Sequence, residues 1–162
     1  MKIGILSDTH GNVPEEMNDF FAPCDELWHS GDIGSLDLYN QLKSWKPLRA
    51  VYGNIDGNDI RIHCPEFLSF ECGGLKILMM HIGGYPPKYN AKSRVLIEQY
   101  RPNIFVCGHS HILKVMYDDK YKMLTINPGA AGIYGFHKAI TLLRFDIKNK
   151  TPKNLEIYHK DR

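Results

Sequence analysis

Short apolar runs alternate with helix-forming segments along the first two thirds of the chain. Runs that begin apolar and end in polar or glycine-rich residues occupy residues 1–8, 25–32, 48–56, 75–84 and 103–111. Helical patterns lie between them at residues 14–22, 35–45 and 91–101, the last of which stops before Pro102. Several of the apolar runs are continuous, as expected for strands that are buried on both faces. This alternation predicts an α/β fold with largely parallel strands.

The second half of the chain has a different pattern. Residues 67–81 read as two strands around a Gly73–Gly74 turn, and residues 112–127 read as a hairpin that turns near Asp118. Further strands are predicted at 138–147 and 154–160. These antiparallel elements favour a two-sheet sandwich with helices outside, formed by residues 1–162 as a single domain. An exposed edge strand near 138–145 would allow a homo-oligomer, unless another segment covers it.

Composition excludes several classes of protein. The chain has 162 residues, 43% of them apolar, and a net charge of +2. This balance argues against a strong nucleic-acid surface, and no apolar run is long enough to span a membrane. The first residues resemble a strand and not a signal peptide. The four cysteines form no C-x-x-C pair, so we expect a cytoplasmic protein with free thiols.

Polar side chains fall at the ends of five predicted strands. In open α/β sheets this edge is where ligands bind. Imidazole and carboxylate together suit divalent Mn, Fe, Ni or Zn, and the set is large enough for two metal sites about 3.5–4 Å apart that share a carboxylate. The predicted ligands are Asp8, His10, Asp32, Asn54, His81, His109 and His111.

Each of these residues has a structural alternative when taken alone. Asp8 and Asp32 could cap helices, Asn54 could belong to a turn, and His81 could be a core histidine. The Gly-His-Ser-His run at 108–111 is less easily explained by structure. Placement of the whole set at successive strand ends favours the metal site.

Five motifs follow one another in order along the chain. They are Asp-x-His at 8–10, Gly-Asp at 31–32, Gly-Asn at 53–54, a lone histidine at 81 and Gly-His-x-His at 108–111. In this order they resemble the calcineurin-like metallophosphoesterases. The short chain, the Ser-Asp-Thr-His-Gly-Asn opening and Asn-Pro-Gly-Ala at 127–130 resemble the small bacterial and archaeal phosphodiesterases of that superfamily.

The resemblance implies a four-layer α/β/β/α sandwich and two divalent metal ions, with Mn²⁺ favoured over Ni²⁺, Fe²⁺, Zn²⁺ or Co²⁺. One metal would be held by Asp8, His10, Asp32 and His111. The other would be held by Asp32, Asn54, His81 and His109, with Asp32 bridging. The expected reaction is in-line attack on phosphorus by a hydroxide between the metals, with Asp32, Asn54 and His109 positioning the hydroxide and the phosphate.

Two departures from the family pattern bear on catalysis. Ile55 stands where many members have a histidine that contacts phosphate or protonates the leaving group, and Ala130 stands where relatives commonly have serine. His137 could supply the missing proton, or it could be a surface histidine. The glycine- and proline-rich loop 82–90 is either a wall of the substrate site or an ordinary connection.

These observations favour a metal-dependent phosphodiesterase acting on a small or nucleotide-type phosphodiester. A phosphomonoesterase with the same metals is the first alternative. A protein-binding scaffold that keeps the fold without activity is the second. A DNA-repair nuclease is disfavoured, because the chain has no additional DNA-binding domain or basic stripe.

Overall fold

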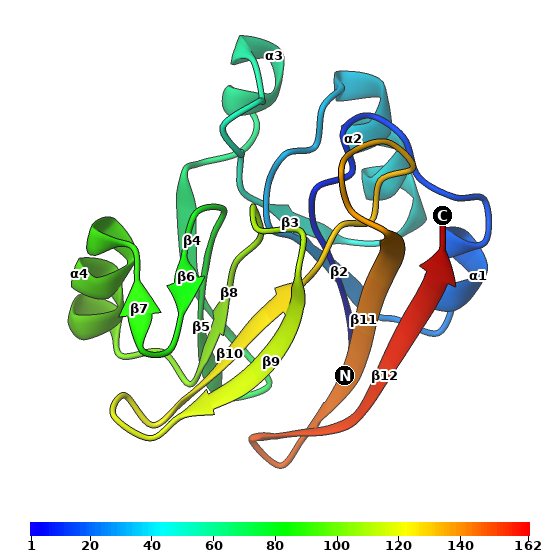
Figure 1. Ribbon diagram of the computed structural model, residues 1–162. Coiled ribbons are helices and arrows are strands. Elements are labelled where there is room, and N and C mark those ends of the chain that lie inside the picture. The colour runs from blue at the N-terminus through cyan, green and yellow to red at the C-terminus, as the bar shows by residue number, and fades with distance from the viewer.

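Two five-stranded β-sheets face each other in the computed structural model, which describes all residues from 1 to 162 (Figure 1). The first sheet has the order β12 (Thr151–Asp161), β11 (Ala139–Lys148), β1 (Lys2–Leu6), β2 (Glu26–His29) and β3 (Leu48–Ala50). The second has the order β4 (Phe67–Cys72), β5 (Leu75–Met80), β8 (Ile104–Val106), β10 (Met123–Pro128) and β9 (Leu113–Asp118). A separate ribbon pairs β6 (Gly84–Tyr85) with β7 (Lys88–Tyr89).

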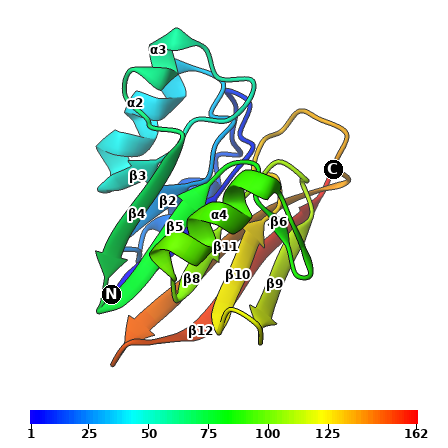
Figure 2. The same cartoon turned by 90° about the vertical axis from the view of Figure 1, so that its left-hand side faces the viewer.

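Helices cover the outer faces of both sheets. They are α1 (Met17–Phe21), α2 (Leu36–Trp45) and α4 (Ala91–Tyr100), while the short α3 (Asn58–Arg61) stands beyond the ends of the strands (Figure 1). Apolar side chains of α1 and α2 pack on the first sheet, and those of α4 pack on the second. Figure 2 shows α4 lying across the outer face of the second sheet. The molecule is therefore a four-layer α/β/β/α sandwich of two mixed sheets, as predicted.

Local sequence accounts for the ends of the two long helices. The Ser35 side chain caps α2 by accepting a hydrogen bond from the backbone N–H of Leu38, and Asn90 caps α4 in the same way. Arg101 ends α4 in the left-handed conformation, directly before Pro102. The helices predicted at 35–45 and 91–101 therefore match α2 and α4.

The largest hydrophobic core lies between the sheets. It contains Ile3, Trp28, Ile77, Val106 and Phe145 among its 14 buried residues. Side chains of β1 are buried on both faces, as the continuous apolar run predicts. At about 25 cal/mol per Å² of buried apolar surface, such a core is the main stabilising term.

Three local features differ from the sequence expectation. The first predicted helix is reduced to the five residues of α1, and α3 and the β6–β7 ribbon were not predicted. The strand near 138–145 is not a sheet edge: β11 lies between β1 and β12, and β12 forms the edge. None of the helices has the length and apolar character that crossing a membrane requires.

Parallel pairing places the strand ends that carry the motifs at one edge of each sheet. β1, β2 and β3 are parallel to one another, as are β5, β8 and β10. The loops after β1, β2, β3, β5 and β8 therefore begin at the carboxyl edges of two parallel sets of strands. These are the loops that hold the predicted ligands.

Candidate metal centre

Backbone hydrogen bonds continue the sheet into the first two loops. The N–H of Asp8 donates to the carbonyl of Gly31 over 3.0 Å, and the N–H of His10 donates to that of Asp32 over 3.1 Å. In the second sheet, the N–H of Gly108 donates to the carbonyl of His81 over 2.9 Å. Neighbouring loops are thus fixed to one another beyond the strand ends, which holds their side chains together.

Left-handed backbone conformation marks most of the predicted ligands. Positive φ angles occur at Asp8 (54°), His10 (49°), Asp32 (56°), His109 (69°) and His111 (58°). For residues other than glycine this conformation costs of the order of 1–3 kcal/mol each and persists only where the surrounding structure enforces it. Its concentration on these residues indicates that the loops are shaped for the site.

Glycines bring the loops closer together than any side chain would allow. A Cβ at Gly53 would lie 2.0 Å from Asp32 Oδ1 and 2.3 Å from the Asp32 backbone nitrogen. At Gly108 it would lie 2.0 Å from Ser7 Oγ. These contacts explain why a glycine comes directly before Asn54 and directly before His109.

Two groups of ligand atoms form where the loops meet. Asp8, His10 and His111 make one group, and Asp8, Asp32 and His81 make the other; within each, the atoms lie within 4.8 Å of one another. His111 Nε2 is 3.2 Å from Asp8 Oδ1, and His81 Nε2 is 3.2 Å from Asp32 Oδ1. Such spacing suits atoms that share a metal ion.

The Asp32 carboxylate faces both groups. Its Oδ1 lies toward His81, while its Oδ2 lies 3.8 Å from His10 Nε2. Burial raises the pKa of Asp32, but the adjacent His81 ring, the N–H of Ile55 and the nearby His10 outweigh burial and lower it. Asp32 is therefore ionised near neutral pH, with one oxygen available to each group.

The pKa values of two histidines in the site are raised. Burial lowers the pKa of His81, but the Asp32 and Asp8 carboxylates outweigh it, so this pKa is raised. The Asp8 carboxylate raises the pKa of His111 against the opposing effect of burial. The site is thus a region of strong negative potential that attracts positive charge, whether a proton or a metal ion.

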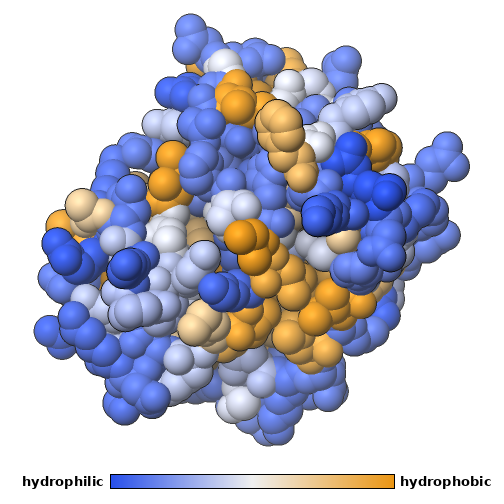
Figure 3. Space-filling model, viewed as in Figure 1, coloured by the Kyte–Doolittle hydropathy of each residue, from blue (hydrophilic) through white to orange (hydrophobic).

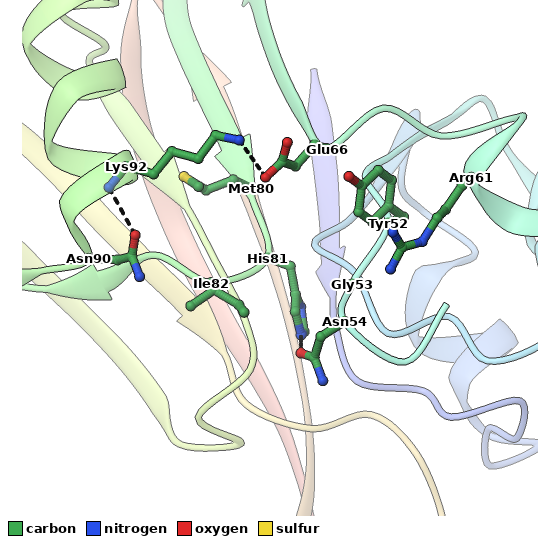
Figure 4. Close-up of a pocket in the computed structure, with 10 residues that line it drawn as sticks. All are labelled: Tyr52, Gly53, Asn54, Arg61, Glu66, Met80, His81, Ile82, Asn90 and Lys92. Atoms are coloured by element: carbon green, nitrogen blue, oxygen red, sulfur yellow. Dashed lines mark hydrogen bonds and ion pairs between the residues drawn. The ribbon is translucent and has the colours of Figure 1, made fainter. Parts of the chain in front are cut away.

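Asn54 and His109 lie at the mouth of the site. Asn54 Oδ1 is 3.1 Å from His81 Nε2, and these two side chains point toward each other in Figure 4. The ring centroid of His109 is 5.2 Å from that of His81. Both residues are exposed, unlike Asp8, Asp32 and His81. All seven side chains predicted from the sequence come together here.

Unpartnered buried atoms test whether a metal fits. Asp8 Oδ1 and His10 Nε2 are buried without a hydrogen-bond partner. Burial of a carboxylate oxygen without a partner is costly. A divalent cation held by these residues would remove that cost, and the donor set of imidazoles, carboxylates and one amide is suited to it. The residues therefore fit a divalent metal centre.

His29 supports the first two loops from below. It is fully buried, and burial lowers its pKa to about 4, so the ring is neutral. The N–H of Gly31 donates to His29 Nδ1 over 3.1 Å, which places the ring proton on Nε2, 2.9 Å from Thr9 Oγ1. Thr9 Oγ1 then donates to the carbonyl of Ile33 over 3.0 Å. This chain of hydrogen bonds fixes the loops of Asp8 and Asp32.

Asp56 has a role that sequence analysis missed. It is buried, and its carboxylate accepts hydrogen bonds from three backbone N–H groups: Ile33 at 3.1 Å, Gly34 at 2.8 Å and Gly53 at 2.8 Å. It thereby joins the loop of Asp32 to that of Asn54. In sequence Asp56 looks like a turn residue, and its position two residues after Asn54 was the only available signal.

Asn127 supports the loop that carries His109 and His111. Its amide donates to the carbonyl of Gly108 over 2.8 Å and to Ser110 Oγ over 3.1 Å, while its Oδ1 accepts from the N–H of Gly129. The two bonds donated by its amide therefore stabilise the loop that carries His109, and the third shapes the turn at 127–129. Ala130, where relatives commonly have serine, is fully buried and offers no hydroxyl to the site.

His137 lies beside the site and not on the open surface. Its ring centroid is 5.3 Å from that of His111, and its Nε2 is 2.9 Å from the carbonyl of Gly132. Burial lowers the pKa of His137, which favours the neutral ring. The side chain of Ile55 is 48% exposed and carries no titratable group.

The loop at 82–90 forms a wall near the site. Gly84, Tyr85 and Lys88 line a cleft of about 390 Å³ together with His109 and Asn127. The hydroxyl of Tyr89 donates to Asp118 Oδ2 over 2.6 Å, which anchors β7 against the hairpin of β9 and β10. This geometry favours a wall of the site over a simple connection.

Comparison with known proteins defines the class. Residues 1–150 match the calcineurin-like phosphoesterase superfamily domain. The chain belongs to this family of metallophosphoesterases, which implies a divalent metal centre.

Two curated archaeal proteins are similar to the chain over 80% of its length. A probable metallophosphoesterase of Methanothermobacter thermautotrophicus is 28% identical, with 77% of its own length covered. A phosphodiesterase of Methanocaldococcus jannaschii is 27% identical, with 83% covered.

Solved structures share the fold at low sequence identity. An archaeal phosphodiesterase has a TM-score of 0.74 at 24% identity, over 98% of this chain and all of its own. Vps29 of Entamoeba histolytica, in complex with zinc, has a TM-score of 0.76 at 16% identity, over 99% of both chains. The fold is therefore found both in a phosphodiesterase and in a vacuolar protein-sorting protein.

Proposed function

We propose that residues 1–162 act as a single domain that hydrolyses a small phosphodiester with the help of two divalent metal ions. The observation that carries this proposal is the convergence of seven candidate ligand side chains, among which Asp8 Oδ1 and His10 Nε2 are buried without a hydrogen-bond partner. The proposal is supported further by the family and by the archaeal relatives.

In this proposal the ligands divide around Asp32. Asp8, His10 and His111 hold one metal, while Asn54, His81 and His109 hold the other. Asp32 contributes to both, because each of its oxygens faces a different group. Mn²⁺ is the proposed ion, since nitrogen and oxygen donors without thiolate suit it, while Ni²⁺, Fe²⁺, Zn²⁺ and Co²⁺ are the alternatives to test.

When bound, such ions lower the pKa of a coordinated water and offset negative charge on phosphoryl oxygens. The protein's own contribution is to orient the substrate. Asn54 and His109 are exposed at the mouth of the site and are the side chains that contact an entering phosphoryl group. Asp32 fixes the separation of the two ligand groups from beneath.

The shape of the site favours a diester over a monoester. A cleft of about 340 Å³ opens on the side of Asn54 and His81, and another of about 670 Å³ opens on the side of His109 and His111. A monoester has one substituent to place, whereas a diester has two. The presence of a cleft on each side therefore supports the diester.

Protonation of the leaving group falls to His137 or to solvent, because Ile55 cannot donate a proton. His137 lies close to His111, but in the neutral ring its one proton points to the Gly132 carbonyl. We therefore expect leaving groups of low pKa to react fastest. His137→Gln tests the donor role: a loss of rate confined to alkyl diesters supports it, and a variant that cleaves alkyl diesters as fast as the unmodified protein contradicts it.

Hydrolysis of bis(p-nitrophenyl) phosphate by metal-stripped protein, with Mn²⁺ added back, tests the function. p-Nitrophenyl phosphate serves as the matching monoester. Asp32→Asn should abolish Mn²⁺-dependent cleavage, while Asp59→Asn, the same change on an exposed residue of α3, should not. Cleavage of the diester above the monoester supports the proposal. Folded protein that cleaves neither ester with any of the five ions would instead favour the protein-binding scaffold.

A further inference from the structure

An apolar cleft opens directly beside the candidate metal centre. Its volume is about 670 Å³, and it shares His109 and His111 with the centre. The apolar residues that line it are Ile112, Leu113, Phe136, Ala139 and Ile157. Figure 3 shows a continuous apolar patch in the middle of this face, over β9 and the adjacent part of β11 and β12. Apolar surface in such a place marks a binding site.

An offset between the edges of the two five-stranded sheets explains why this surface is open. Ile157 pairs with Leu143, whose side chain lies in the core between the sheets, so Ile157 faces the same side. The second sheet ends at β9, however, and no further strand covers β12. Ile157 is consequently 48% exposed, and Ile112 at the start of the opposite wall is 53% exposed.

The apolar surface continues away from the metal centre. A smaller cleft of about 220 Å³ is lined by Val115 and Leu155, with Ile126 and Phe145 beside them. Val115 and Leu155 each lie two residues from a lining residue of the first cleft, on the same strand and the same face. Two residues of strand span about 6.6 Å. The two clefts together form a trough between β9 and β12 that begins at the metal centre.

The opposite side of the centre is polar. There Arg61, Glu66 and Lys92 line the cleft that contains Asn54 and His81 (Figure 4). Arg61 is held by its Nε, which donates to the carbonyl of Asp56 over 2.7 Å, so its remaining N–H groups are available to a ligand. A molecule seated on the metals thus meets polar, charged groups on one side and apolar groups on the other.

We infer that the substrate is an amphiphilic phosphodiester, with an alkyl chain as one substituent and a polar group as the other. The chain lies in the trough between β9 and β12, and the polar group lies toward Arg61. This inference rests on the proposed function, since continuity with the metal centre is what identifies the occupant. A second copy of this protein is the competing occupant of the same surface.

Binding of octylphosphonate and methylphosphonate to the Mn²⁺-loaded protein tests the inference without any need for turnover. Calorimetry at concentrations below micelle formation should show octylphosphonate binding at least tenfold more tightly. Burial of only two of its seven additional methylenes is enough for about a tenfold preference. Equal affinity for the two phosphonates would overturn the inference.

Variants test whether the preference for octylphosphonate arises from the trough. Ile112→Ser combined with Ile157→Ser should reduce the octyl-to-methyl ratio to less than threefold. Ile62→Ser, an equivalent change at a 77% exposed isoleucine outside the trough, should leave the ratio unchanged. A ratio that persists in the double variant overturns the inference. The inference is also overturned if the unmodified protein shows no preference for octylphosphonate and forms a dimer, seen by light scattering, that the double variant converts to a monomer.

Failure of the proposed function has a different signature. If the protein prefers octylphosphonate but does not cleave bis(p-nitrophenyl) phosphate with any metal, the trough is supported as a binding site for an alkyl chain and the hydrolytic function is contradicted. If the protein cleaves the diester but binds both phosphonates equally, the hydrolytic function is supported and the trough is contradicted as a binding site for an alkyl chain.

Discussion

Replacement of Asp56 by asparagine tests how strongly the metal-site loops depend on one carboxylate. Asp56 Oδ2 accepts hydrogen bonds from Ile33 and Gly53, and Oδ1 accepts one from Gly34. Asparagine offers a single acceptor oxygen and an NH₂ group. Even in its better orientation, which keeps the bonds from Ile33 and Gly53, the NH₂ group faces the N–H of Gly34.

The size of the effect follows from these contacts. A hydrogen bond to a charged group contributes about 1.5–3 kcal/mol, and a buried donor left without a partner costs a similar amount. We therefore expect Asp56→Asn to lower the free energy of unfolding by about 2–3 kcal/mol. Asp56→Ala leaves three donors unpartnered and should cost at least about 4 kcal/mol. Since domains are stable by only about 5–15 kcal/mol, the alanine variant should lose a large part of its stability.

Urea unfolding of the metal-free proteins measures the difference. Asp59→Asn is the matched control, because Asp59 is exposed three residues away on α3. The slope of unfolding free energy against urea should stay constant, so that the shift of the midpoint reports stability alone. Calorimetry should also show weaker Mn²⁺ binding by Asp56→Asn, because Asp56 joins the loops of Asp32 and Asn54.

A particular result would refute this reasoning. If Asp56→Asn unfolds within about 0.5 kcal/mol of the control, which is the range of ordinary surface substitutions, the three backbone contacts do not stabilise the loops. Unchanged Mn²⁺ affinity would show that the ligand positions do not depend on them either.

Three further predictions concern the same region. Because burial lowers the pKa of His29 from 6.5 to about 4, the unfolded chain binds its proton first on acidification. The free energy of unfolding should therefore fall by up to about 3 kcal/mol as the pH is lowered between those two values. Urea unfolding at several pH values measures this fall, and a His29→Gln variant that loses stability as steeply as the unmodified protein would contradict the prediction. The raised pKa values of His81 and His111 predict proton release when Mn²⁺ binds and weaker binding as pH falls; heats that are the same in buffers of different ionisation enthalpy would argue against it. Gly53→Ala, whose Cβ would lie 2.0 Å from Asp32 Oδ1, should lower Mn²⁺-dependent hydrolysis at least 100-fold, and near-normal rates from folded variant protein would show that the loops can yield.

The sequence was sufficient to predict how the ligands come together. Continuous apolar runs identify strands buried on both faces, and the rule that ligands gather at the carboxyl ends of such strands brings Asp8, Asp32 and His81 to one place. Helix caps at Ser35 and Asn90 are likewise local signals. Features that depend on one element and its immediate neighbours are therefore readable in advance.

Other features depend on contacts that no local pattern contains. The two-residue strands of the β6–β7 ribbon are too short to show a period. Asp56 has the composition of a turn residue, and only the fold shows the three N–H groups that it binds. The exposure of Ile157 arises because β12 extends past the last strand of the facing sheet. The mistaken edge at 138–145 has a related origin, since the pairing of β11 with β1 joins opposite ends of the chain.

The edge formed by β12 has a consequence for the behaviour of the protein at high concentration. A regular exposed strand is a template for aggregation by pairing with another chain. Here Pro152 has no N–H to offer, and Lys153 places positive charge on the edge. The pairing with β11 also shifts register between Arg144 and Asp146, where Asn154 has a left-handed backbone that interrupts the strand. Two copies brought edge to edge would therefore repel and fit poorly, so the exposed strand should remain soluble without a covering partner.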